Sequence, residues 1–299
     1  ESFESSDGLS QNTVYALGED REGSLWVGTK NGLNQFLDGA ATRYTRSEGL
    51  PGENMGAILE DHHGNLWAGT LDGGLARFDG RRFSPVTSLA SGSITTLAES
   101  TDGSLWAGTN RGLNRLQDGQ VRETYGVAQG LPSPEIRSLF RDSGGKLWAG
   151  TGKGVVVFRD GRFVSPPALA RNLTGPIASI GEAHDGTLLF AVEHGGVFLF
   201  KNESLRKLED NSLPPPRLPF RDVTAIYTDP DGVVWMGSNG GGLAMWRDGK
   251  LSRFLVRDGL FDNEIYGFVP EAKDRLWMAC SNGFFWVTRA DLFNYASGK

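Results

Sequence analysis

The chain has 299 residues, of which 22% are charged, with a formal net charge of −6 and an isoelectric point near 5.3. An acidic balance of this kind argues against a general nucleic-acid role, and no apolar run approaches the roughly 18 residues that a membrane helix needs. We therefore expect neither nucleic acid among its partners nor a membrane segment in this fragment. The single cysteine, Cys280, excludes an intrachain disulfide and is expected to be a small buried residue.

One motif recurs along the whole chain. Its first copy, residues 20–33, reads DREGSLWVGTKNGL and is anchored on Trp26. The seven anchor positions are Trp26, Trp67, Trp106, Trp148, Leu189, Trp235 and Trp277. They are separated by 41, 39, 42, 41, 46 and 42 residues. A period of about 40 residues indicates a repeat architecture, in which no unit can bury its faces alone, so we expect one domain rather than two over residues 1–299.

Each repeat contains four short apolar runs. In the first copy these are residues 14–17, 25–29 and 32–36, followed by a weaker run that includes Tyr44. Gly, Asn and Asp separate the runs, as they do in hairpins between strands. Four strands per repeat are typical of a propeller blade. The seven repeats therefore predict an all-β fold, a seven-bladed β-propeller of four-stranded antiparallel blades.

The anchor residues are interpreted as core. The segment Leu-Trp-x-Gly-Thr is apolar on both faces of its strand, which indicates burial between two neighbouring blades. The Trp side chain would fill the gap between blades, and the Gly two residues later would leave room beside it. Asp20, Asp61 and Asp142 precede the turn and are expected to fix it by accepting backbone N–H bonds. None of these residues is assigned any chemistry.

The two ends of the chain are expected to meet. Residues 1–9 align with residues 42–50, so Phe3 occupies the position of an outer strand ahead of the first blade. The last repeat ends with a third strand, residues 284–287, and lacks a clear fourth. We therefore predict that the N-terminal strand completes the last blade and removes an otherwise open edge.

Three later segments depart from the repeat. Repeat five has Leu189 where the others have Trp. A long insertion, residues 202–220, contains Pro214, Pro215 and Pro216, which favour an extended conformation without ladder bonds. We interpret it as an excursion at the outer rim, with partner docking as the alternative. Within the tail, residues 289–299, the pattern before a Ser-Gly pair predicts a short helix, the only helix that we expect.

The loop before each inner strand and the hairpin after each Trp strand are expected to share one face of the ring, and there the repeats stop agreeing. The candidate ligand-binding residues are Asn12, Lys30, Glu53, Asn54, Asp72, Arg111, Glu135, Lys153, His194, Arg221, Asp222 and Glu264. Amides, carboxylates and cations in one ring suit hydrogen bonding to a polyhydroxylated or charged ligand. The alternative is that these are ordinary polar turn residues.

Signals for catalysis are weak. The four histidines, His62, His63, His184 and His194, fall in different turns. The sequence has no nucleophile, zinc-binding or phosphate-loop motif and no cysteine cluster. We therefore expect no catalytic residue, no metal and no cofactor, and hence no enzyme. Two alternatives stay open: a lyase or hydrolase that uses carboxylates such as Glu53 and Glu264, and a scaffold for protein–protein interaction.

The repeat as a whole resembles the two-component regulator propeller repeat. The motifs that carry the resemblance are Leu-Trp-x-Gly-Thr at residues 25–29, 66–70 and 105–109, together with the Gly-Leu segments at residues 8–12, 49–54 and 259–263. The resemblance extends over essentially the whole chain, and repeat five departs from it.

This resemblance implies the sensor part of a bacterial transmembrane signalling protein, in the periplasm or outside the cell. Such proteins carry a histidine kinase, a hybrid kinase or a diguanylate cyclase as output, and many members sense glycans. The resemblance thus implies a small-molecule or oligosaccharide ligand, with the neighbouring sensor modules and signalling domains of the parent chain as partners. None of those output parts is present here, so the chain resembles an excised sensor fragment.

Overall fold

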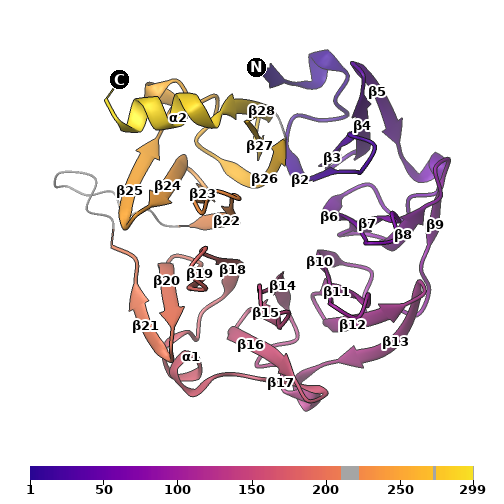
Figure 1. Cartoon of the computed structure of the whole chain (residues 1–299). Coiled ribbons are helices and arrows are strands. Elements are labelled where there is room, and N and C mark those ends of the chain that lie inside the picture. Colours follow the sequence, from indigo (N-terminus) through magenta and orange to yellow (C-terminus); the bar gives the residue numbers. More distant parts are fainter. Residues whose placement is uncertain (210–221, 272–273, 299) are drawn as a thin grey trace.

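The computed structural model describes residues 1–209, 222–271 and 274–298, and these form a ring of seven four-stranded antiparallel sheets (Figure 1). Blades 1 to 3 consist of β2 (Val14–Glu19), β3 (Leu25–Thr29), β4 (Gly32–Leu37) and β5 (Ala40–Tyr44); β6 (Met55–Glu60), β7 (Leu66–Thr70), β8 (Gly74–Phe78) and β9 (Phe83–Pro85); and β10 (Ile94–Glu99), β11 (Leu105–Thr109), β12 (Gly112–Gln117) and β13 (Gln120–Tyr125).

Blades 4 to 6 follow the same order from the axis outward. They consist of β14 (Ile136–Arg141), β15 (Leu147–Thr151), β16 (Gly154–Arg159) and β17 (Arg162–Val164); β18 (Ile177–Glu182), β19 (Leu188–Val192), β20 (Gly196–Lys201) and β21 (Ser204–Lys207); and β22 (Val223–Thr228), β23 (Val234–Ser238), β24 (Leu243–Arg247) and β25 (Lys250–Phe254). The predicted seven-bladed propeller is confirmed.

Blade 7 joins the two ends of the chain. Its strands are β26 (Ile265–Glu271), β27 (Arg275–Cys280), β28 (Gly283–Thr288) and, outermost, β1 (Ser2–Phe3). Phe3 pairs with Phe284, and their rings stack with centroids 4.9 Å apart. The predicted closure by the N-terminal strand is therefore confirmed, and Figure 1 shows both termini beside this blade.

The core lies between blades, and Trp26, Trp106 and Trp148 each pack on aromatic side chains of the next blade. Trp26 meets Phe78 and Phe83 of blade 2, with ring centroids 5.3 and 6.4 Å away. Trp106 repeats this packing on blade 4. The first residue of each inner strand is also buried, with an exposed fraction of at most 1%; these residues are Val14, Met55, Ile94, Ile136, Ile177, Val223 and Ile265. Cys280 is buried as expected.

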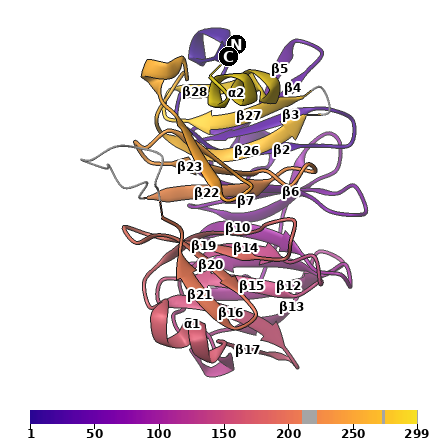
Figure 2. The same ribbon diagram turned by 60° about the vertical axis from the view of Figure 1, so that its left-hand side comes forward.

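The prediction of a single helix is wrong, because the described residues contain two α-helices. The expected terminal helix is α2 (Arg289–Ala296), and the missed one is α1 (Pro167–Asn172) on the rim near β17 and β21 (Figure 2). Pro167 occupies the first turn, where the absent N–H costs nothing, and Leu169 is fully buried. Six residues are too few for the sequence to show a helical period.

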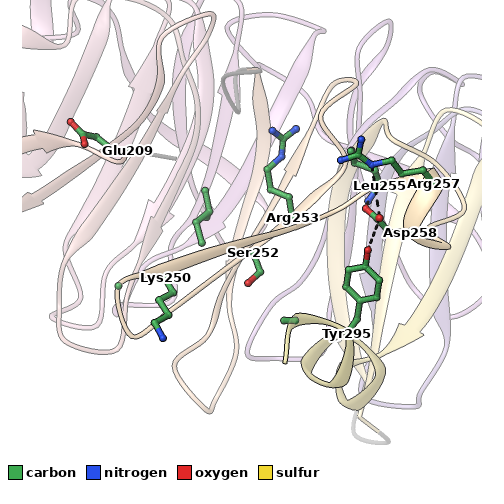
Figure 3. A pocket seen from close by; sticks show the side chains of 11 residues that line it. Glu209, Lys250, Ser252, Arg253, Leu255, Arg257, Asp258 and Tyr295 are labelled. Carbon is green, nitrogen blue, oxygen red and sulfur yellow. Dashed lines mark hydrogen bonds and ion pairs between the residues drawn. The ribbon is translucent and has the colours of Figure 1, made fainter. Parts of the chain in front are cut away.

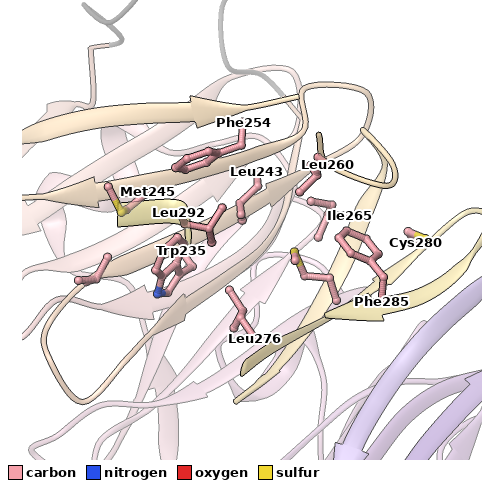
Figure 4. Packing of buried hydrophobic residues seen from close by; sticks show 12 residues of the cluster. Trp235, Leu243, Met245, Phe254, Leu260, Ile265, Leu276, Cys280, Phe285 and Leu292 are labelled. Carbon is pink, nitrogen blue, oxygen red and sulfur yellow. The ribbon is translucent and has the colours of Figure 1, made fainter. Parts of the chain in front are cut away.

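Helix α2 packs against the rim of blade 6. Leu292 is 6% exposed and joins the cluster of Trp235, Met245 and Phe254 (Figure 4). At the start of the helix the Arg289 guanidinium contacts Asp229, Asp231 and Asp274 at 2.8–3.2 Å. The helix is thus held to two neighbouring blades. The insertion with its three prolines falls mostly on residues 210–221, which lie outside the described residues.

Candidate ligand-binding site at the mouth face

The face on which the seven inner strands begin is called the mouth face here. The hairpin that follows each Trp strand reaches the same face, since its backbone bonds to the residue that precedes an inner strand. The Leu71 N–H donates to the Asn54 carbonyl (2.7 Å), and the Asn239 N–H donates to the Asp222 carbonyl (2.9 Å). The expectation that pre-strand loops and hairpins share one face is therefore met in these blades.

Every inner strand carries a β-bulge at its second residue, where the register with the neighbouring strand shifts. These seven residues, here called the bulge ring, are Tyr15, Gly56, Thr95, Arg137, Ala178, Thr224 and Tyr266. Each is at least partly exposed, although the residue before it is buried. A bulge leaves one residue outside the ladder and re-aims its side chain, so this position can vary without changing the blade.

Four members of the bulge ring line one cavity. The cavity has a volume of about 400 Å³ and spans the beginnings of β10, β14, β18 and β22. Its polar lining comes from the bulge ring, from pre-strand residues and from hairpins. Those residues are Thr95, Asn110, Glu135, Arg137, Glu193, His194, Asp222, Thr224 and Asn239.

Three contacts between charged or titratable side chains organise the cavity. Arg137 donates from Nε to Glu135 and from a terminal nitrogen to Glu193, both at 3.0 Å, and so joins blade 4 to blade 5. His194 Nδ1 lies 2.7 Å from Asp222 Oδ1, and the same oxygen accepts the His194 backbone N–H at 2.8 Å. Both His194 and Asp222 have φ of 55°, in the left-handed region. Asp and His are among the residues that adopt this region most readily, and their mutual bond supports the two turns.

An aromatic pair faces this cavity from across the axis. In a ring of seven, blade 4 stands opposite blades 7 and 1, as the inner strands in Figure 1 show. These blades contribute Tyr15 and Tyr266, whose rings lie 6.3 Å apart at 24°. Tyr15 is 41% exposed. The Tyr266 hydroxyl donates to Glu264 at 2.6 Å, and burial, followed by that carboxylate, raises the pKa of Tyr266 well above its usual value.

The predicted site residues divide into groups. Three of them, Glu135, His194 and Asp222, meet at the cavity, and Glu264 stands beside Tyr266. The cations Lys30, Arg111 and Lys153 are exposed hairpin residues that do not line it. Arg221 lies outside the described residues.

The remaining predicted residues take part in local structure. Asn12 accepts the Ser5 N–H at 2.8 Å. Asp72 accepts the Asn54 N–H at 3.1 Å and contacts Arg46 at 3.2 Å. The Glu53 carbonyl accepts the Gly32 N–H at 2.8 Å. Such contacts are also expected of ordinary polar turn residues, the alternative given for these positions.

Arg137, Tyr15 and Tyr266 were missed by the sequence analysis. They stand within strands, where core residues are expected, and not in the loops from which ligand-binding residues were predicted. The available signal is that the second strand position varies from Gly to Arg and Tyr while both flanking positions stay small or apolar.

Another cavity, of about 500 Å³, lies on the outer rim of blade 6, away from the mouth face (Figure 3). Strand β25, the end of α2 and the 3₁₀ turn Val256–Asp258 form it, and the Tyr295 hydroxyl bonds Asp258 across one end at 2.5 Å. None of the predicted site residues lines it.

Two features are absent from the described residues. They contain no group of three or more His, Cys, Asp or Glu side chains placed to hold a metal ion. No helix among them is both long and apolar enough to cross a membrane.

Solved structures share this fold. The extracellular domain of a protein assigned to the hybrid two component systems of B. thetaiotaomicron superposes with a TM-score of 0.83 at 21% identity, over 96% of this chain and 40% of that one. A second extracellular domain from that organism, assigned to a one component system, superposes with a TM-score of 0.79 at 22% identity, over 96% of this chain and 42% of that one. The chain thus spans less than half of either. Virginiamycin B lyase from Staphylococcus aureus superposes with a TM-score of 0.71 at 14% identity, over 92% of this chain and 94% of that one.

The repeats also match a family model. No curated protein matches the sequence, but the model of the two component regulator propeller matches residues 8–31, 49–72, 88–111, 130–153 and 217–240. These segments hold the inner strand and the Trp strand of blades 1 to 4 and of blade 6, whereas blades 5 and 7 are absent from them. With five matched repeats in one closed ring, the chain belongs to the two-component regulator propeller proteins.

Proposed function

We propose that this domain senses an extracytoplasmic ligand, a carbohydrate, at its mouth face and does so without catalysing a reaction. The observation that carries the proposal is the arrangement around the axis: the Arg137 ion pairs on one side and the Tyr15–Tyr266 pair on the other. Sugar hydroxyls can both donate to carboxylates and accept from a guanidinium or an amide. Aromatic rings supply the apolar surface that most small-molecule sites contain.

The ring also favours binding on entropic grounds. The loops at the mouth face stand on strands that pack between blades, so their relative positions are set before a ligand arrives. Less side-chain and loop ordering then opposes association. Binding would bias how the propeller packs against neighbouring sensor modules of the parent chain, which is the step that would pass the signal to its signalling domains.

The similar extracellular domains support an extracytoplasmic location, periplasmic or extracellular. They do not bear on the ligand, because likeness at this identity concerns the fold alone. The similarity to a lyase is of the same kind, and we base no catalytic role on it.

A glycan array followed by calorimetry tests the proposal. The double variant Arg137→Ala/Glu193→Ala removes both partners of one ion pair and should weaken the array's best saccharide about tenfold or more. The matched control Lys30→Ala/Arg111→Ala changes two residues outside the cavity and should bind within about twofold of wild type. Equal weakening by both pairs would place the site elsewhere.

Two further outcomes would favour the alternatives. Capture of proteins without binding of any saccharide would support the scaffold. Turnover of a saccharide that disappears in Glu53→Gln or Glu264→Gln would establish a lyase or hydrolase and overturn the absence of catalysis.

A further inference from the structure

We infer that the ligand of the mouth face carries a positively charged amine, as an amino sugar does. The inference rests on the proposed function and names the chemical class of its ligand. It follows from three features: where the charges of the described mouth residues stand, what the aromatic pair adds, and which cations are excluded from the cavity.

Two rings of residues border the axis at this face. The pre-strand ring consists of the residues immediately before the inner strands: Thr13, Asn54, Ser93, Glu135, Pro176, Asp222 and Glu264. It contains three carboxylates and no cation. The bulge ring contains one cation, Arg137, and this guanidinium already bonds Glu135 and Glu193. Asp222 lies 2.7 Å from His194 Nδ1, on a neighbouring hairpin. Glu264, on blade 7, therefore remains as uncompensated negative charge among the described residues of the two rings.

Apart from Arg137, the described Lys and Arg residues considered at this face stand outside both rings. Lys30, Arg111 and Lys153 are exposed at hairpins that do not line the cavity, and Arg46 is 3.2 Å from Asp72. An acidic sugar that entered the cavity would meet carboxylates and one occupied guanidinium. Like charges in a partly desolvated site repel strongly, so the arrangement disfavours uronic acids and sulfated sugars.

The aromatic pair points to the same ligand class. An ammonium group is attracted to the face of a Tyr ring, and more strongly where water is partly excluded. The carboxylate of Glu264 stands at the edge of the Tyr266 ring, since the Tyr266 hydroxyl donates to it at 2.6 Å. Blade 6 is tied to blade 7 at the same level, because the Thr224 hydroxyl donates to the Ile265 carbonyl. An amine held near Tyr266 would thus meet the Glu264 carboxylate beside an aromatic face, on blades whose relative position is fixed.

The two sides of the axis then take different parts of one ligand. Blades 6, 7 and 1 offer carboxylates and aromatic faces to the amine. Blades 4 and 5 offer the Glu135–Arg137–Glu193 group to hydroxyls, as in the proposed function. Ala178 occupies the bulge position of blade 5 and adds only a small side chain between these sides.

Calorimetry with saccharides matched in length tests the inference. The probes are tetramers of glucosamine and of galactosamine, their N-acetylated forms, which are neutral, and tetragalacturonate, which is acidic. We expect an amine-bearing tetramer to bind at least about tenfold more tightly than its N-acetylated form, and its affinity to fall as salt is raised. Equal or tighter binding of the N-acetylated or acidic tetramers would overturn the inference and leave the proposed function standing.

Variants locate the amine. Glu264→Gln and Tyr266→Ala should each weaken the amine-bearing tetramer about tenfold while changing the N-acetylated one by less than about threefold. Glu22→Gln, an exposed carboxylate on the opposite face, is the matched control and should have no effect. Unchanged melting temperatures show that the variants fold. Equal weakening of both tetramers would contradict recognition of the amine.

Spermidine separates the inference from the proposed function. It carries amines without a sugar. If spermidine binds as tightly as the amine-bearing tetramers, the amine is recognised and the carbohydrate proposal fails. If no tetramer and no spermidine binds, the inference fails, and binding of another saccharide on the glycan array would leave the proposed function standing.

Discussion

At the scale of single residues, the anchor Trp side chains are held by a hydrogen bond as well as by packing. The indole N–H of Trp26, Trp67 and Trp148 donates to the Asp six residues earlier, at 2.7–2.8 Å. The other oxygen of each Asp accepts backbone N–H groups of the turn. One carboxylate thus joins the turn to the core. Blade 3 has Ser100 at this position, and its hydroxyl accepts the Trp106 indole N–H at 3.0 Å.

Truncation of an anchor should be severe. Trp26→Ala or Trp148→Ala should lower the free energy of unfolding by about 3–5 kcal/mol, because a large buried ring is replaced by a cavity. Urea denaturation gives the value. Leu37→Ala, at a 37% exposed position in the same blade as Trp26, is the control. A loss below about 1 kcal/mol would contradict the core role of the anchors.

Acid should weaken one of these turns measurably. Burial raises the pKa of Asp61, but bonds from the Trp67 indole, Asn65 and turn N–H groups outweigh it, so the pKa lies below its usual value. A depressed folded-state pKa contributes stability above the unfolded pKa of about 3.9, and that contribution disappears as the pH falls through the folded value. Asp61→Asn should therefore lose less stability than wild type between about pH 5 and pH 2. The control Asp38→Asn, at an exposed position, should lose as much stability over this pH range as wild type. If stability falls equally with pH in all three proteins, the contribution of Asp61 is refuted.

At the scale of elements, blade 5 lacks the bond between turn and core. Ala183 stands at the Asp position and Leu189 at the Trp position. Packing persists, since Leu189 and Phe190 are fully buried, but no carboxylate ties the turn to the anchor strand.

Blade 5 should therefore be the softest part of the ring. Amide hydrogen exchange in β18 and β19 should be faster than in β2 and β3, since local opening there breaks fewer cooperative contacts. Mass spectrometry of peptides from the two blades measures the difference. Equal protection of blades 5 and 1 would show that apolar packing alone replaces the bond.

A Glu at the end of the inner strand connects several blades through the opposite face. Glu60, Glu99 and Glu182 each accept a turn N–H of the preceding blade, from Arg21, His62 and Ser143. Blade 6 has Thr228 in this position, and its hydroxyl is buried without a hydrogen-bond partner in the described structure. A cavity of about 470 Å³ lies beside it.

Restoring the Glu should stabilise the ring. Thr228→Glu places a carboxylate within reach of the blade 5 turn, and the cavity has room for it. We expect a gain of roughly 0.5–1.5 kcal/mol in the free energy of unfolding, and a loss of similar size for the reverse change Glu182→Thr. Thermal and urea denaturation measure both. Destabilisation by Thr228→Glu would mean that the turn N–H is already satisfied.

The strands could be predicted from the sequence wherever a single residue type marks the end of a strand or a buried position. The Gly and Asp of each hairpin mark where strands end, and the alternation around Trp26 marks what is buried. The bulge ring was not predictable in this way, because a bulge depends on the pairing of two strands and leaves no residue type of its own. For the same reason Glu135 and Asp222 were recognised from their loops, whereas Arg137 and Tyr266 were taken for strand residues.

At the scale of the whole molecule, the ring depends on two residues at its start. Strand β1 contains only Ser2 and Phe3, yet it completes blade 7 and covers the edge of β28. Phe3 also contacts Phe36 of blade 1, with ring centroids 6.3 Å apart. Phe3 therefore adds to the contacts that join the last blade to the first, such as the Tyr15–Tyr266 pair.

Removal of residues 1–9 should open the ring. The melting temperature should fall by roughly 5 °C or more, because a buried aromatic residue and the last strand pairing are both lost. Scanning calorimetry measures this, with Ser6→Ala, an exposed change in the same segment, as control. An unchanged melting temperature would mean that blade 7 holds without its outer strand.

The bulge ring has a consequence for how such receptors diversify. A residue outside the ladder can be exchanged with little penalty to folding, and this chain already shows Gly, Ala, Thr, Arg and Tyr at the seven equivalent positions. Most substitutions that alter a binding surface also disturb the fold, which limits what selection can explore. Here the backbone geometry of the bulge separates changes in the binding surface from changes in the fold. Gly56 is the exception, because a Cβ there would lie 2.2 Å from the Ile94 carbonyl oxygen. Descendants of one propeller could therefore acquire new ligands by single mutations at positions such as Ala178, and a laboratory library restricted to the six positions other than Gly56 should retain an unusually high fraction of folded members.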